Sequence, residues 1–243
     1  MTQHLIITGA TKGIGKALAT HFLKKENTAV IGIARSESTI AHDRYTHHRM
    51  DLSDLDRLDK GADSILPTLQ SGDEVVLVNN AGLLGDIGHL GSTERPSFRK
   101  VMDVNVTAVA YLMDAFIDRY AGHRGNRVIL NISSGAGKSP VDGWAAYCAS
   151  KAAADMLSRV AAEECAMDGN GIRIFAVAPG VVDTGMQTEI RSADKKDFSN
   201  VQRFLDLKSE GQLSSSEEVA EKLAEVIEKP EKFKEVCLDV RKF

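Results

Sequence analysis

A serine, a tyrosine and a lysine in the middle of the chain have the types and the spacing needed for proton transfer. Tyr147 and Lys151 are four residues apart, and Ser134 precedes Tyr147 by thirteen residues. Residues four apart share one face of a helix, and the stretch around them is rich in alanine. A free phenol has a pKa of about 10, and a nearby ammonium group lowers it, so we expect Tyr147 to be a usable proton donor. The spacing of Tyr147 and Lys151 alone is more typical of two surface residues on an amphipathic helix.

The residues before Tyr147 predict how these side chains meet. An apolar run from Val128 to Ile132 is typical of a strand, and it leads into a Ser/Gly loop and then the alanine-rich helix. If the strand and the helix pack side by side, Ser134 reaches the same point as Tyr147. Ser133 is also a candidate, but the spacing favours Ser134, and alternation along the strand points Ser133 away. We therefore expect Ser133 to be structural.

The N-terminal region predicts a nucleotide site. Leu5 to Thr8 is a short apolar run of the kind that forms a buried parallel strand, and it enters the sequence T-G-A-T-K-G-I-G before a helical pattern. Gly9, Gly13 and Gly15 permit a tight turn and bring backbone N–H groups close to a pyrophosphate at the start of the helix. On its own this pattern is a weak indication.

The end of the second predicted strand bears on the choice of dinucleotide. A site for NAD has an acidic residue about twenty residues after the glycines, which accepts a hydrogen bond from the ribose 2′-hydroxyl. This chain has Ala34 and Arg35 there, and Lys12 lies in the glycine turn. A guanidinium group cannot accept that bond, but it binds a 2′-phosphate well. These cations favour NADP as the cofactor, although two ordinary surface cations are the alternative.

These features together resemble the short-chain dehydrogenase/reductase family. The Ser, Tyr and Lys spacing, the G-x-x-x-G-x-G turn and N-N-A-G after a buried strand carry the resemblance. The segments D-T-G-M-Q (183–187), L-K-S-E-G-Q-L (207–213) and A-E-K-L (220–223) are similar to the sepiapterin and benzil reductase branch. The resemblance implies a single α/β domain with a Rossmann-type, doubly wound fold and a seven-stranded parallel sheet flanked by helices. It also implies a homodimer, with a tetramer as the alternative.

Apolar patterning places the remaining elements. We expect strands at 29–34, 45–50, 74–78, 171–178 and 235–240, and helices at 55–69, 97–120, 147–167 and 217–228. The polar segment 185–213 is expected to be irregular and to act as a substrate loop or lid.

The resemblance assigns roles to further residues. Asn105 would distort the helix at 97–120 and hold a water leading to Lys151, with a surface asparagine as the alternative. Asp51 would meet the adenine amino group, although it also suits a helix cap. Val182 and Thr184 would hold the nicotinamide carboxamide. The cofactor-binding residues implied are Gly9, Thr11, Lys12, Gly13, Ile14, Gly15, Arg35, Ser36, Asp51, Leu52, Asn80, Ala81, Gly82, Tyr147, Lys151, Pro179, Gly180, Val182 and Thr184.

The same branch implies a substrate class. Its members carry a substrate-anchoring aspartate near the C-terminus, and Asp239 is the matching position; Met186 and Gln187 are the other expected substrate residues. An alternating strand with a terminal acid is the alternative explanation of Asp239. We predict NADPH-dependent reduction of a ketone, with a vicinal dicarbonyl favoured. A reductase or dehydrogenase for another ketone or secondary alcohol, and a non-catalytic NADP-sensing protein, are the competing hypotheses.

Composition excludes several other classes of protein. With 243 residues the chain suits one domain, and a net charge of −4 gives no reason to expect nucleic acid or an anionic membrane. No apolar run approaches the roughly 20 residues of a membrane span, and no leader sequence is expected. The seven histidines are scattered, so no metal site is predicted. Three cysteines without a C-x-x-C pair indicate reduced thiols and a cytoplasmic protein.

Overall fold

A seven-stranded parallel sheet forms the centre of the molecule in the computed structural model, which describes residues 1–243. The strand order is β3-β2-β1-β4-β5-β6-β7, and all six pairings are parallel. The strands are β1 (Gln3–Thr8), β2 (Thr28–Ala34), β3 (Tyr45–Arg49), β4 (Glu74–Asn79), β5 (Arg127–Ile132), β6 (Arg173–Ala178) and β7 (Cys237–Asp239). The predicted fold class is confirmed.

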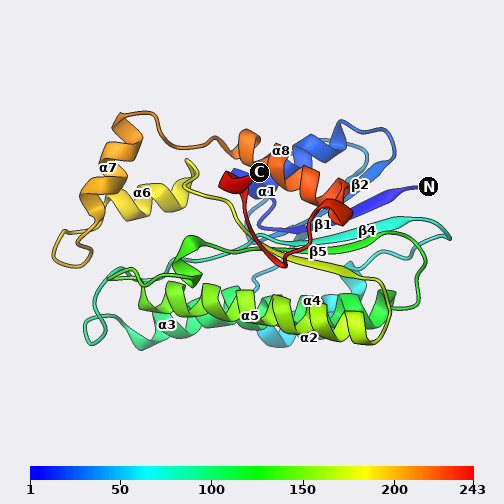
Figure 1. The fold of residues 1–243 in the computed structure, drawn as a ribbon, viewed down its shortest axis with the longest axis horizontal. Coiled ribbons are helices and arrows are strands. Elements are labelled where there is room, and N and C mark those ends of the chain that lie inside the picture. Colours follow the sequence, from blue (N-terminus) through cyan, green and yellow to red (C-terminus); the bar gives the residue numbers. More distant parts are fainter.

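Helices cover both faces of this sheet. In Figure 1, α1 and α8 lie on one face, and α2, α4 and α5 lie on the other. The helices are α1 (Gly13–Leu23), α2 (Leu55–Ile65), α3 (Arg95–Met102), α4 (Ala108–Tyr120), α5 (Ala145–Met167), α6 (Gly185–Arg191), α7 (Val201–Ser209) and α8 (Ser216–Glu228). None of these helices combines the length and the apolar character that crossing a bilayer requires.

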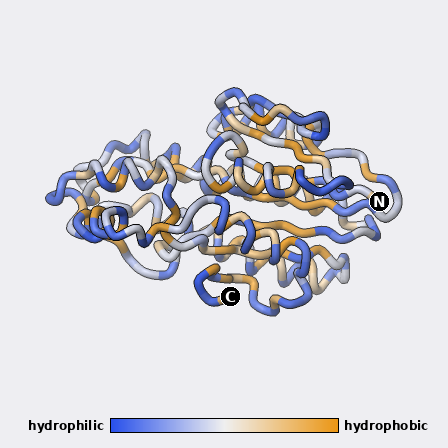
Figure 2. Tube along the Cα trace, turned by 90° about the horizontal axis from the view of Figure 1, so that it is seen from above, coloured by the Kyte–Doolittle hydropathy of each residue, from blue (hydrophilic) through white to orange (hydrophobic).

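The central strands are apolar on both faces because each face is covered, whereas the edge strand β3 (Tyr45–Arg49) is polar and only partly buried. In β1, Leu5 and Ile7 belong to the hydrophobic cluster shared with α1 and α8, whereas Ile6 between them belongs to the cluster shared with α2 and α4. All three side chains are fully buried. In Figure 2 the hydrophobic residues gather along the chain segments that run through the middle of the molecule. This continuous apolar pattern is what distinguishes a buried parallel strand from a half-exposed one.

The strand order reverses at the centre of the sheet and thereby fixes the position of the site. The chain leaves β1 toward β2 and β3, then returns to place β4 on the other side of β1. In open α/β sheets, ligands bind outside the carboxyl ends of the strands at such a reversal. The glycine turn follows β1, the N-N-A-G segment follows β4, and the Ser loop and the P-G-V-V-D-T loop follow β5 and β6. All four predicted site segments therefore lie at the same edge of the sheet.

The structure corrects two of the predicted elements. The helix expected at 97–120 is two α-helices, α3 and α4, joined by a π-helix at Asp103–Thr107. The segment 185–213 was expected to be irregular, but it contains α6 and α7, which extend beyond the sheet at the left of Figure 1. Phe204 on α7 and Phe198, which lies between the two helices, pack against Trp144, and the sequence pattern does not reveal this distant partner.

Candidate active site

Three of the four predicted catalytic side chains, those of Ser134, Tyr147 and Lys151, come together at the end of β5; Asn105 is the fourth. Tyr147 and Lys151 lie one turn apart on α5, and both are buried, with 7% and 5% of their surface exposed. Lys151 Nζ donates a hydrogen bond to the carbonyl oxygen of Ile132 at 2.7 Å and lies 5.6 Å from the centre of the Tyr147 ring. The Ser134 hydroxyl interacts with the Tyr147 phenol. A proton donor, a neighbouring hydroxyl and a cation thus occupy one small volume.

Burial dominates the acidity of both titratable groups. It raises the pKa of Tyr147, and the interaction with Ser134 opposes this only in part. The expected lowering of that pKa by Lys151 is therefore not the net effect in this structure. Burial also lowers the pKa of Lys151 to about 8, against the opposing charge of Asp155. At pH 7 the ammonium form of Lys151 still outnumbers the amine by about ten to one.

Asn105 lies in the π-helix between α3 and α4 and is almost fully buried, with 1% of its surface exposed. Its Oδ1 accepts from the N–H of Leu83 at 2.8 Å, and its Nδ2 donates to the Leu83 carbonyl at 2.8 Å and to Ser150 Oγ at 3.0 Å. Ser150 Oγ in turn donates to the Tyr147 carbonyl at 2.8 Å. Asn105 therefore joins the loop after β4 to the helix that carries Tyr147 and Lys151.

The glycine turn and the N-N-A-G segment are tied together behind the predicted pyrophosphate site. Thr8 Oγ1 accepts from the N–H groups of Asn80 at 2.9 Å and Ala81 at 3.0 Å. Gly13 has φ +55°, where a side chain would be strained. A Cβ on Gly15 would lie 2.4 Å from the Gly9 carbonyl oxygen, so any larger residue would push the turn apart. Ile14 follows in the first turn of α1, where the helix begins.

Arg35 and Ser36 form an exposed turn after β2, next to the glycine turn. Thr11 Oγ1 and Ser36 Oγ are 2.9 Å apart, which brings this turn against the start of the glycine turn. Two side chains from β3 contact the backbone of the Arg35–Ser36 turn. His47 Nε2 lies 3.0 Å from the Ser36 carbonyl oxygen, and Arg49 Nε donates to the Arg35 carbonyl at 3.1 Å. Neither His47 nor Arg49 was predicted to take part in the site, because a contact between two strands leaves no signal in the sequence of either one.

The predicted adenine residues Asp51 and Leu52 follow β3. Asp51 accepts hydrogen bonds from the Ser53 backbone N–H at 2.9 Å and from Ser53 Oγ at 2.8 Å. Partial burial acts to raise the pKa of Asp51, but these bonds hold it below its usual value. The side chain that caps α2 belongs to Asp54, which accepts from the Arg57 N–H, so the helix-cap alternative for Asp51 is wrong. Leu52 is buried.

The P-G-V-V-D-T loop after β6 meets the glycine turn from the other half of the sheet. A Cβ built on Gly13 would lie 3.3 Å from Thr184 Cγ2, so these two segments lie against each other. Pro179 and Gly180 leave β6, and Val182 is buried and pairs with Ser214 in an isolated parallel bridge. Together with Gly82, where a Cβ would lie 3.6 Å from Lys151 Nζ, these segments form a cradle that fits a nicotinamide dinucleotide.

An aromatic cluster covers Tyr147 on the side of α6 and α7. The ring of Trp144 lies 5.9 Å from that of Tyr147 in a T-shaped arrangement, 5.0 Å from Phe198 and 5.6 Å from Phe204. These residues were not predicted as part of the site, although Trp144 is the chain's one tryptophan and lies three residues before Tyr147.

The predicted substrate residues Met186 and Gln187 begin α6, at the border of this aromatic cluster. Gln187 is 7% exposed, and its Oε1 has no hydrogen-bond partner. The indole Nε1 of Trp144 is likewise buried and without a partner. Buried polar atoms are seldom left unpaired, so these two atoms are candidates for contact with a polar ligand.

Asp239, the third predicted substrate residue, is already paired. It pairs with Ala178 across β6 and β7, at the same edge of the sheet as the site. Its carboxylate accepts from Arg241 Nε at 2.9 Å and Arg241 Nη2 at 2.5 Å. These bonds lower the pKa of Asp239 to about 2. An anchoring role would require the carboxylate to leave Arg241.

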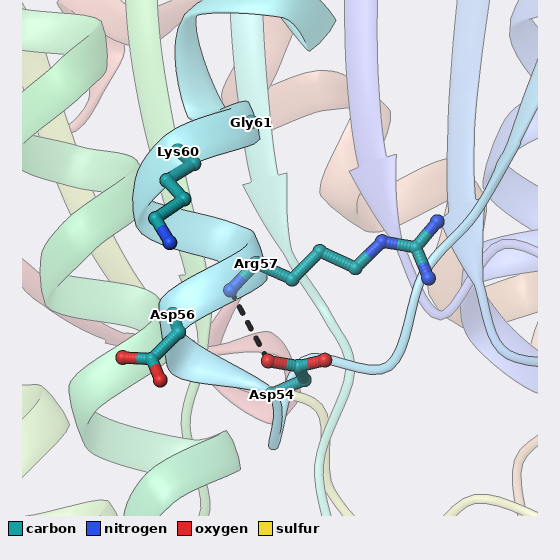
Figure 3. Close-up of a pocket in the computed structure, with 5 residues that line it drawn as sticks. All are labelled: Asp54, Asp56, Arg57, Lys60 and Gly61. Carbon is teal, nitrogen blue, oxygen red and sulfur yellow. Dashed lines mark hydrogen bonds between the residues drawn. The ribbon is translucent and has the colours of Figure 1, made fainter.

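A separate depression lies at the start of α2 and has a different character. Figure 3 shows Asp54, Asp56, Arg57, Lys60 and Gly61 around it, with Arg57 N–H bonded to Asp54 Oδ1. It has no hydrophobic lining residue. None of the predicted site residues lines it, so it is not the catalytic cleft.

Comparison with known proteins agrees with this geometry. A sequence model described as short chain dehydrogenase matches residues 3–195. The chain belongs to the short-chain dehydrogenase family. It is therefore an oxidoreductase of the kind that uses a nicotinamide cofactor, and the resemblance inferred from its motifs is confirmed.

Relatives in this family include both kinds of reductase expected from the predicted branch. A benzil reductase from Bacillus subtilis (strain 168), described as (S)-benzoin forming, is 35% identical over 226 residues, covering 92% of this chain and 93% of the relative. A sepiapterin reductase from Meriones unguiculatus is 31% identical over 245 residues, covering 92% and 90%. Among solved structures, ElxO with NADP bound has a TM-score of 0.78 at 26% identity, covering 99% of this chain and 97% of the other.

Proposed function

We propose that this short-chain dehydrogenase is an NADPH-dependent reductase of ketones, with vicinal dicarbonyls as its preferred substrates. The observation that carries the proposal is the convergence of Ser134, Tyr147 and Lys151 at the carboxyl end of β5, at the same edge of the sheet as the glycine turn. The benzil and sepiapterin reductases among its relatives support the substrate class, since benzil carries two adjacent carbonyl groups.

Each catalytic side chain then has one role. When bound, the reduced nicotinamide supplies a hydride to the carbonyl carbon of the substrate. Tyr147 holds a proton at its phenol oxygen and gives it to the carbonyl oxygen, while Ser134 donates a hydrogen bond to that oxygen as negative charge develops. Lys151 Nζ donates one hydrogen bond to the Ile132 carbonyl, and its two remaining N–H groups are available to bind the nicotinamide ribose hydroxyls. Asn105 holds the water from which the proton is replaced.

The preference for NADP rests on cations around the predicted 2′-phosphate site. Arg35 and Lys12 are both exposed and lie on the two turns that Thr11 and Ser36 bring together. Arg49 adds a third cation, whose guanidinium donates to the Arg35 carbonyl. Guanidinium groups bind phosphate oxygens with paired hydrogen bonds. The solved relative with NADP bound supports the same choice.

The substrate site is proposed to lie between Tyr147 and the segment 185–213, which would act as its lid. The aromatic rings of Trp144, Phe198 and Phe204 offer a flat apolar surface of the kind that suits an aromatic ketone. Gln187 and Trp144 supply unpaired polar atoms for a second oxygen or an N–H group of the substrate. Met186 and Gln187 are therefore better placed as substrate residues than Asp239, whose carboxylate Arg241 holds.

A homodimer is proposed through the outer faces of α4 and α5. Large apolar side chains are exposed there: Tyr111 on α4 at 39%, and Met156 and Val160 on α5 at 54% and 46%. Met156 and Val160 are four residues apart and share one face of the helix. Covering this patch with the same face of a second copy would remove these side chains from water.

The proposal is tested by following NADPH consumption with sepiapterin, benzil, an aliphatic diketone and an aromatic monoketone. Turnover of the dicarbonyls with NADPH is expected, with weaker activity when NADH replaces it. Tyr147→Phe removes the proton donor and keeps the ring, so kcat should fall by about 10²–10⁴-fold while NADPH still binds. Tight NADPH binding without turnover of any compound would instead indicate a different substrate or a non-catalytic role.

A further inference from the structure

Three contacts connect the end of β5 to one face of α5. Tyr147, Lys151 and Asp155 follow each other at intervals of four residues along the helix. Ser134 interacts with Tyr147, the Ile132 carbonyl accepts from Lys151 at 2.7 Å, and Ser133 Oγ donates to Asp155 Oδ1. We call these three contacts the strand-to-helix ladder. Two of them involve the catalytic groups, and the third has no part in the mechanism described so far.

The third contact contains a buried carboxylate. Asp155 is 5% exposed and Ser133 is 2% exposed. Burying a charged group is costly unless it is paired and hydrogen-bonded, so a carboxylate is seldom buried without a function or a counter-charge. One helical turn away, Lys151 is buried as well and carries the opposite charge.

The surroundings of this pair contain few other charges. Lys151 faces Tyr147 and Asp155 on its own helix and the uncharged Ile132 carbonyl on β5. Asp155 faces Ser133 on β5, Arg159 one turn further along α5, and the thiol of Cys237 on β7, whose Sγ lies 4.0 Å from the Asp155 carbonyl oxygen. Arg159 itself is exposed and donates to Cys237 at 3.3 Å. Lys151 is the buried cation nearest to the carboxylate along the helix.

We propose that Asp155 and Ser133 are positioning residues for the reaction. The Asp155 carboxylate keeps the buried Lys151 in its ammonium form. The hydrogen bond between Asp155 and Ser133 fixes the position of the end of β5 along α5, so that Ser134 meets Tyr147. Neither residue touches the reacting atoms. The inference rests on the proposed function in that it takes Lys151 as a cofactor contact, but its test does not need a ketone substrate.

The test measures the dissociation constant of NADPH by cofactor fluorescence between pH 6 and 10. Wild-type affinity should fall as pH rises through about 8, where Lys151 loses its proton. Asp155→Asn keeps an acceptor for Ser133 but removes the charge, so this loss should move to lower pH by about one unit. Glu164→Gln removes an exposed charge from the same helix and should leave the pH dependence unchanged. Lys151→Met should abolish the fall in NADPH affinity between pH 6 and 10.

Ser133→Ala separates the two parts of the proposal. It leaves the Asp155 carboxylate in place, so the pH dependence should stay where the wild type has it, while kcat falls because Ser134 is less well aligned. An unshifted pH dependence in Asp155→Asn, or one that survives in Lys151→Met, would overturn the proposal. If the protein binds NADH rather than NADPH, the proposed cofactor preference is refuted. The same pH titration with NADH then still tests the positioning role of Asp155.

Discussion

The Asn105→Ala variant tests whether the π-helix is held in place by the bonds seen at its centre. The substitution removes three hydrogen bonds: two to the backbone of Leu83, both of 2.8 Å, and one of 3.0 Å to Ser150. A net contribution of about 1 kcal/mol for each bond predicts a loss of about 3 kcal/mol in the free energy of unfolding. For a chain of 243 residues this corresponds to a fall in Tm of roughly 6–12 °C.

Urea unfolding followed by circular dichroism measures this loss directly. Asn105→Asp is the informative companion, because it keeps an acceptor for the Leu83 N–H but replaces the amide that donates to the Leu83 carbonyl and to Ser150. It should destabilise the protein at least as much as Asn105→Ala, although its shape is nearly unchanged. Asn27→Ala at an exposed position is the control and should change stability by less than about 0.5 kcal/mol.

Stability of Asn105→Ala within about 0.5 kcal/mol of the wild type would refute the reasoning, since it would mean that Leu83 and Ser150 do not depend on this amide. Because Ser150 lies between Tyr147 and Lys151 on α5, loss of the Asn105 contact should also lower kcat. A variant as stable as the wild type but without turnover would instead point to the proton-replacing role alone.

Three further outcomes are expected. Arg35→Ala should raise the KM for NADPH by about tenfold, which corresponds to about 1.4 kcal/mol of lost phosphate binding, and leave the KM for NADH unchanged; equal effects on both would place Arg35 outside the 2′-phosphate site. The kcat/KM of the wild type should fall as pH rises through about 8, because the ammonium form of Lys151 is lost there, and a flat profile to pH 9.5 would contradict this assignment. Val160→Glu puts a charge on the exposed face of α5 and should convert a dimer into monomers in size-exclusion chromatography with light scattering, whereas a dimer that persists would exclude this face.

Most of the fold was predictable because the sheet is buried on both faces. Continuous apolar runs such as Val75–Val78 have few alternatives to a covered parallel strand, and each is followed by turn residues. The predicted strand at 235–240 is shorter in the structure, Cys237–Asp239, because its pairing with β6 covers only three residues. Pattern alone therefore predicts that a strand exists better than it predicts where pairing stops.

The elements that escaped prediction depend on distant partners. The helices α6 and α7 are polar over much of their surface, and Phe198 is buried because it packs against Trp144, more than fifty residues earlier in the chain. The π-helix at Asp103–Thr107 has the same cause, since Asn105 there bonds to Leu83 and Ser150. No local pattern reports such contacts, although a family resemblance did single out Asn105.

The parts of the site that lie on a single helix or strand could be predicted from the sequence. The contacts between residues of different secondary-structure elements could not. The interval of four between Tyr147 and Lys151 continues to Asp155, so the sequence already contains the helix side of the strand-to-helix ladder. The strand side is different, because Ser133 and Ser134 lie beyond the last residue of β5, where alternation no longer holds. Both serines in fact face α5, and they differ in which turn of it they meet.

This difference gives the two serines separate chemical roles without any difference in residue type. Ser134 meets a phenol whose pKa burial raises, and its hydroxyl opposes that shift at the atom that gives up the proton. Ser133 meets a carboxylate two turns away, where its hydroxyl stabilises the charge that faces Lys151. Because Tyr147 and Asp155 lie two turns apart on α5, a slide of β5 along the helix would break both contacts, so the bond between Ser133 and Asp155 helps to hold the register in which Ser134 meets Tyr147.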